Sequence, residues 1–194
     1  MAGATGYGFG RNRVRHGVVR TDLLQGTDVR SSMVSIRYLN ASNQEAEIDN
    51  GNIVSLAPNN LIDNTFGVGA GREYTHGVFE ARNMAVDTPL ENLILVATPE
   101  LMHDERYDDL ADFYNEAGTN ARGYRLRSGD IFSVTAEALT GTTPFAVGNF
   151  VNRQVGTRGL VAAARTAASF GKIIEIETVG TGMFGRTYYV ILVL

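Results

Sequence analysis

The glycine-rich stretch GTGMFG, Gly180–Gly185, has the Gly-x-Gly-x-x-Gly spacing of a dinucleotide-binding turn. Such a turn needs a helix directly after it, because amides at the helix N-terminus bind the pyrophosphate. The segment that follows is RTYYVILVL, whose β-branched and aromatic residues favour a strand. We therefore predict that these glycines connect a β-hairpin, and we predict no nucleotide or other cofactor.

A second group of residues with possible chemistry is acidic and lies near the middle of the chain. It comprises His103, Asp104, Glu105, Asp108 and Asp109. Carboxylates four positions apart share one face of a helix, which is a geometry that a metal ion can use. The group lies on one short predicted helix, and the sequence offers no second ligand cluster. We interpret it as a solvated helix face and predict no metal site.

The sequence carries no signature of nucleophilic catalysis. The chain has no cysteine, which excludes thiolate nucleophiles, disulfides and cysteine metal sites. The histidines at 16, 76 and 103 lie in unrelated contexts, and neither Gly-x-Ser-x-Gly nor His-Glu-x-x-His occurs. We predict a protein that is not an enzyme, with no catalytic residues and no small-molecule substrate. A triad assembled only in space leaves the enzyme alternative open.

The composition indicates a globular protein of about one domain. The chain has 194 residues, of which 44% are hydrophobic and 20% charged, close to ordinary globular usage. The net charge of -4 argues against a general nucleic-acid binder. The longest apolar run, YYVILVL, has the length of a strand, and no charged start precedes an apolar signal region. We expect neither a membrane-spanning nor a secreted product.

Residues 1–32 are rich in glycine and arginine and show no helical period. We predict a flexible N-terminal arm, for which three interpretations stay open: a disordered tail, an arm that orders on a protein partner, and a tail that binds nucleic acid. Aromatic and arginine side chains are the usual interface anchors. The candidate partner-binding residues of the arm are Tyr7, Phe9, Arg11, Arg13, Arg15 and Arg20.

Residues 33–194 have mainly β patterns. Alternating or continuous apolar runs predict strands at 35–39, 73–82, 93–97, 131–135, 147–151, 172–180 and 187–194. The Asp49–Gly51 turn between residues 46–48 and 53–57 predicts a further hairpin. The segment 159–170, GLVAAARTAASF, fits either a helix or a strand followed by a turn.

One helix is predicted from near residue 104 to residue 117. Tyr107, Leu110, Ala111 and Tyr114 form one apolar stripe at helical spacing, and Gly118 fits a C-cap. The sequence therefore predicts a mainly β (α+β) fold: a single compact domain at 33–194, similar to a β-barrel or sandwich, with one short helix and an extended N-terminal arm.

One long segment is distinctive enough to suggest a known family. It is residues 96–141, VATPELMHDERYDDLADFYNEAGTNARGYRLRSGDIFSVTAEALTG. With IDNGNIVSLA before them and GKIIEIETVG and YYVILV after them, they resemble small structural proteins encoded in the head-gene region of tailed bacteriophages. The resemblance covers most of residues 35–194 in order. It does not include the N-terminal arm, and residues 159–170 are atypical.

The resemblance implies a capsid decoration or cement protein. Its implied partners are the major capsid protein and further copies of itself, with no nucleic acid and no membrane. The implied location is the virion capsid, after synthesis in the cytoplasm of the bacterial host. The family has no catalytic motif, so no residue role is carried over. Alternatives are another virion component, such as a head fibre, neck or tail subunit, or a virion-associated carbohydrate-binding or hydrolytic module.

Overall fold

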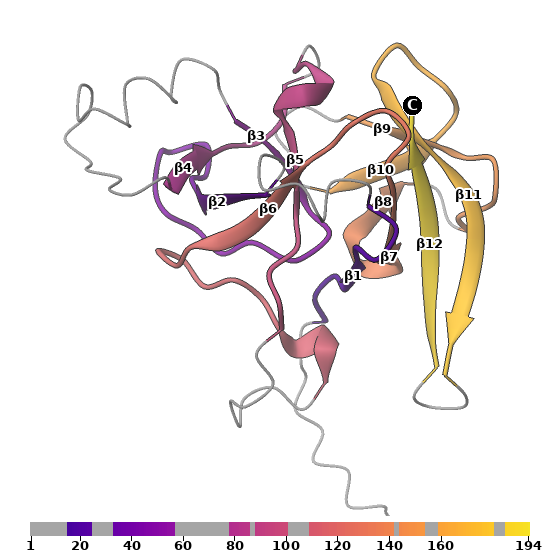
Figure 1. Ribbon diagram of the computed structural model, residues 1–194, viewed down its shortest axis with the longest axis horizontal. Helices are drawn as coiled ribbons and strands as arrows, with labels where there is room; N and C mark the ends of the chain where they lie inside the picture. The colour runs from indigo at the N-terminus through magenta and orange to yellow at the C-terminus, as the bar shows by residue number, and fades with distance from the viewer. Residues whose placement is uncertain are drawn as a thin grey trace, which may run out of the picture.

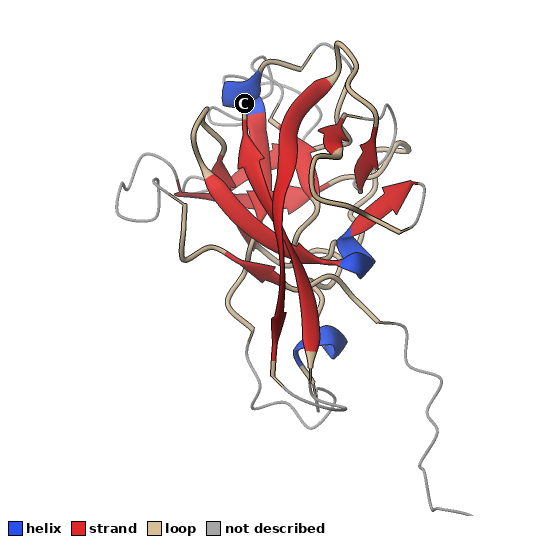
Figure 2. Cartoon of the chain, turned by 90° about the vertical axis from the view of Figure 1, so that its right-hand side faces the viewer, coloured by secondary structure: helices blue, strands red, loops and turns tan. Residues whose placement is uncertain are grey.

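The apolar runs of the sequence form two β-sheets in the computed structural model (Figures 1 and 2). The structure describes residues 15–24, 33–56, 78–85, 88–100, 109–141, 144–153, 159–180 and 185–194. The sheets pack face to face as a sandwich or half-barrel, which confirms the predicted mainly β fold.

The first sheet has seven strands, and neighbouring strands are antiparallel except for β10 and β8, which are parallel. In spatial order its strands are β1 (Val19–Arg20), β7 (Ile131–Thr135), β12 (Arg186–Val193), β11 (Ser169–Val179), β9 (Phe150–Asn152), β10 (Leu160–Ala163) and β8 (Leu139–Gly141). The predicted hairpin is present, because β11 and β12 pair from Gly171–Val193 to Val179–Arg186. The segment 159–170 forms β10, a turn and the start of β11, so the strand interpretation is the correct one.

The second sheet has five strands, and only β2 and β4 run parallel. In spatial order its strands are β3 (Ile53–Ser55), β5 (Leu93–Val96), β6 (Ala121–Arg125), β2 (Met33–Tyr38) and β4 (Val78–Ala81). Three one-turn 3-10 helices complete the described elements: η1 (Leu90–Asn92), η2 (Leu110–Asp112) and η3 (Ala136–Ala138).

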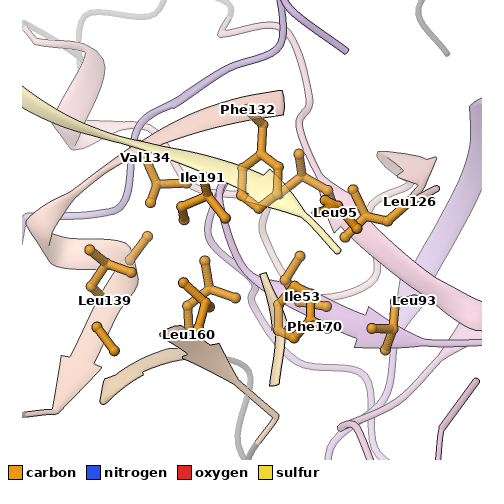
Figure 3. Close-up of a cluster of buried hydrophobic side chains, with 14 of the residues drawn as sticks. Ile53, Leu93, Leu95, Leu126, Phe132, Val134, Leu139, Leu160, Phe170 and Ile191 are labelled. Atoms are coloured by element: carbon orange, nitrogen blue, oxygen red, sulfur yellow. The ribbon is translucent and has the colours of Figure 1, made fainter. Parts of the chain in front are cut away.

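The main hydrophobic core lies between the sheets (Figure 3). Phe132, Val134 and Ile191 of the first sheet pack with Ile53 and Leu95 of the second. A second cluster covers the opposite face of the five-stranded sheet. Strand β5 contributes to both clusters and all four of its residues are buried, as the apolar run LILVA predicted.

The helix predicted up to residue 117 is wrong for its described part, while residues 101–108 lie outside the described residues. From Asp109 the chain forms only the single turn η2 and then continues extended. Burial alternates at Ala111, Phe113 and Asn115, which is the period of a strand, whereas Leu110 of the predicted stripe is 37% exposed. An antiparallel bridge between Asn115 and Ile48 fixes this extended conformation.

The predicted hairpin at residues 46–57 has its turn in the expected place but not its pairing. Gly51 has φ +82°, a left-handed conformation that glycine adopts without strain. The Asn50 side chain is fully buried, and it donates to the Thr98 carbonyl and accepts from the Thr98 amide. These contacts hold the turn against the end of β5, so that β3 pairs with β5 and Ile48 pairs elsewhere.

Candidate interaction surface

Part of the predicted N-terminal arm belongs to the seven-stranded sheet. Tyr7, Phe9, Arg11 and Arg13 lie outside the described residues, as do residues 25–32. Residues 15–24 instead pack on the body: β1 pairs with β7, and Val18 and Leu24 are buried. The assignment of these ten residues to a flexible arm is therefore corrected. The reason is that HGVVR supplies a short apolar strand that adds to the free side of β7.

Two residues before β1 fix the path of this segment. His16 Nδ1 lies 2.7 Å from Asp49 Oδ1, and the imidazole stacks on the Tyr114 ring with centroids 4.8 Å apart. At Gly17 a Cβ atom would lie 2.5 Å from the carbonyl oxygen of Asn50, so a larger residue does not fit without movement. The chain therefore meets the body at a defined position.

Arg20, on β1, contacts the β11–β12 hairpin of the same chain. Its guanidinium donates to Glu177 at 3.0 Å and to Asp22 at 2.9 Å, and it lies over the Tyr188 ring, 5.5 Å from the centroid. The pKa of Arg20 is raised, and the largest cause is the hydrogen bond to Asp22. Desolvation lowers this pKa, whereas the charges of Asp22 and Glu177 raise it further. Within the folded chain the carboxylates of Asp22 and Glu177 accept hydrogen bonds from this guanidinium. That Arg20 binds a partner stays a prediction.

Arg15 is exposed and lines a hollow of about 160 Å³ near the start of β12. Arg186, which also lines the hollow, forms an ion pair with Asp109. Asp109 is the one member of the predicted acidic group within the described residues, and its partner is this arginine. Across the described ranges, no three His, Asp or Glu side chains are grouped as metal ligands.

The long hairpin of β11 and β12 extends beyond its neighbours (Figures 1 and 2). Strand β9 pairs with β11 only over Ser169–Lys172, and the backbones of Gly148 and Asn149 bond the next residue, Ile173. Farther along, no strand in the described part of the chain pairs with β11 on the side away from β12. We call this side of residues 174–179 the β11 edge.

The β11 edge also carries exposed apolar side chains. Ile174, Ile176 and Val179 are 37%, 39% and 49% exposed, and Val147, next to Gly148 where the pairing ends, is 59% exposed. Glu175, Glu177 and Val179 lie on one face of the strand, because residues two apart share a face. The alternation in KIIEIETV predicts the strand, but it does not predict that β12 is the only described strand paired with its outer half.

Comparison of the chain with protein-family models, curated proteins and solved structures found no match. Among the residues that the structure describes, no helix is both long and apolar enough to cross a membrane. The functional proposal therefore rests on the sequence and on the contacts described above.

Proposed function

We propose that this chain is a non-enzymatic structural protein of a tailed-bacteriophage virion that binds the major capsid protein and stabilises the head. The observation that carries the proposal is the β11 edge, where no described strand pairs with β11 on the side away from β12 and where Ile174, Ile176 and Val179 are exposed. Strand edges of this kind bind other chains through main-chain hydrogen bonds. The resemblance of residues 96–141 to phage head proteins supports the same proposal.

The hairpin suits docking because its base is rigid. Ile173 and Ile191 are completely buried in the main core, and β12 lies between β7 and β11 in the sheet. The exposed half of β11 therefore extends from a fixed support. A preorganised surface loses less conformational entropy on binding than a flexible one, so more of the contact energy remains as affinity.

A head-stabilising protein acts by mass action. Each copy that binds the assembled shell, and not the separated subunits, shifts the equilibrium toward the shell. Copies arranged on a symmetric lattice also act together, because neighbouring contacts raise the effective concentration of each copy. Modest affinity at one docking surface is then sufficient for full occupancy of the head.

The test is co-sedimentation of the purified chain with heads of its phage from which the protein has been stripped. We expect saturable binding, at a copy number that matches the lattice symmetry, and a higher melting temperature of the shell. Ile176→Lys should lower the bound copy number at least tenfold, since a charge replaces an apolar docking residue. Met33→Lys is the matched control, because Met33 is similarly exposed at 44% but lies on β2 of the other sheet.

No binding to heads would contradict the proposal. Binding to isolated tails or necks instead would indicate another virion component. Binding to glycans or hydrolysis of them would favour the carbohydrate-binding or hydrolytic alternative.

A further inference from the structure

We propose that the β11 edge accepts the N-terminal segment of a second copy, residues 9–13, as an added antiparallel strand. The inference deepens the proposed function, on which its biological meaning rests: the edge joins neighbouring copies, and the joined copies bind the shell together. Association between copies is nevertheless measured in solution without heads. Failure of the inference and failure of the proposed function are therefore distinguishable.

The β11 edge carries negative charge, which favours pairing with a strand that carries positive charge. Glu175 and Glu177 lie on the same face, and Glu175 has no ion-pair partner among the described residues. Pairing of two β11 edges would place like charges close together, which is unfavourable. Arg20 shows the favourable alternative within the chain, because it already pairs with Glu177 at 3.0 Å.

The N-terminal segment has the complementary pattern. Its large side chains occupy alternate positions, and small or short ones lie between them: the first set is Tyr7, Phe9, Arg11, Arg13 and Arg15, the second Gly8, Gly10, Asn12 and Val14. In an extended conformation each set lies on one face. Three arginines at successive alternate positions occur nowhere else in the sequence.

The two patterns match in one register. With antiparallel strands, Arg13 lies opposite Glu175, Arg11 opposite Glu177 and Phe9 opposite Val179. On the other face, Asn12 then lies opposite Ile176. Directly opposed side chains of antiparallel strands are in contact distance. This register therefore places the Arg13–Glu175 charge pair and the Phe9–Val179 apolar pair on a single face, with Arg11 beside Glu177, which also contacts Arg20.

The position of Arg15 favours a second copy over the same copy. Arg15 lines the hollow formed with Thr135 and Glu137, beyond the end of β7, whereas the edge lies on the far side of β12. Arg15, the first described residue after the donor segment, and the acceptor edge are thus on opposite sides of the β11–β12 hairpin. A contact of this kind between copies is head-to-tail, and it closes into a ring or continues along a lattice.

The experiment measures association of the full-length chain by sedimentation velocity over a range of concentrations. We expect reversible assembly, and we expect the amides of residues 174–179 to gain protection from hydrogen exchange as the copies assemble. Glu175→Arg and Arg13→Glu should each weaken association about tenfold, the effect of a lost charge pair of moderate strength. The double variant, with the charges exchanged, should recover to within about threefold of the original chain. Glu91→Arg, a charge reversal on η1, is the control and should leave association unchanged.

A mixing experiment identifies the donor and the acceptor. Arg11→Glu/Arg13→Glu chains lack a functional donor, and Ile176→Lys chains lack a functional acceptor. Each should remain monomeric alone, while the mixture should form a heterodimer, because one intact interface remains. A monomeric full-length chain with a protected edge would show pairing within one copy and overturn the proposal. Unchanged assembly of the donor variant, or no recovery on charge exchange, would overturn it as well.

Discussion

The two halves of β11 belong to one continuous strand and have different environments. In the inner half, Ser169–Ile173, the strand is paired on both sides, and Ile173 is completely buried. In the outer half, Ile174–Val179, β12 is the only described strand paired with β11, and Ile176 is 39% exposed. The comparison teaches that an apolar alternation specifies a strand, whereas the strands beside it decide whether its isoleucines are core or surface.

A β-bulge separates the two halves. The register with β12 shifts between Ile173 and Glu175, so that Ile174 is the extra residue. Beyond the bulge the hairpin depends on a different support. Tyr188, opposite Glu177, forms a small buried cluster with Val18 and Ala111. The inner half is therefore held by the main core. The outer half is supported through Tyr188 by Val18 and Ala111, and through Tyr189, opposite Ile176, by the margin of the main core.

The largest expected effect compares two isoleucines of the same strand. Ile173→Ala should lower the free energy of unfolding by about 2–5 kcal/mol, because it leaves a cavity in the main core. Ile176→Ala should change it by less than about 0.5 kcal/mol, because the side chain is largely in solvent. Urea unfolding of both variants measures the difference. Equal losses would show that the outer half is as tightly packed as the inner half.

An intermediate effect is expected at Val18. Val18→Ala removes two carbons from the cluster with Tyr188 and Ala111, and should cost about 1–2 kcal/mol. Hydrogen exchange should become faster in the outer half of β11 and in β1, with little change in β9 and β10. Exchange that increases equally in both halves would contradict a separate support for the outer half.

The strand positions were largely predictable because period-two patterns are local. The sequence indicated β2, β5, β7, β11 and β12, and it indicated that Gly180–Gly185 connects a hairpin. The stripe that predicted a helix up to residue 117 failed because a distant backbone, at Ile48, pairs with Asn115. The Asp49–Gly51 hairpin failed because Asn50 bonds Thr98, which is far away in the sequence.

The candidate site was predictable only in part, for the same reason. The glycines and arginines of residues 1–32 predicted an arm, yet the apolar pair Val18 and Val19 was a local signal for the strand that β1 forms. Contacts of Arg20 with Glu177 join residues 157 positions apart, and no local pattern reveals them. The side of β11 that no described strand pairs with is likewise a property of the strand order, since pairing with β9 ends at Lys172.

A smaller effect on stability than at Val18 is expected at Arg20, and it tests the outer half most specifically. Both Arg20 and Glu177 are 35% exposed, so the ion pair contributes less than about 1 kcal/mol, and added salt should reduce its contribution further. Arg20→Gln should nevertheless speed amide exchange at residues 175–179, because it removes both the bond to Glu177 and the contact with the Tyr188 ring. Arg37→Gln, which breaks the surface pair with Glu45, is the control and should leave β11 unchanged. If Arg20→Gln altered the inner half as much as the outer half, β11 would open as one unit and the distinction between its halves would concern exposure alone. Faster exchange confined to residues 175–179 would show that Arg20 of β1 holds the β11 edge in the conformation that another strand needs.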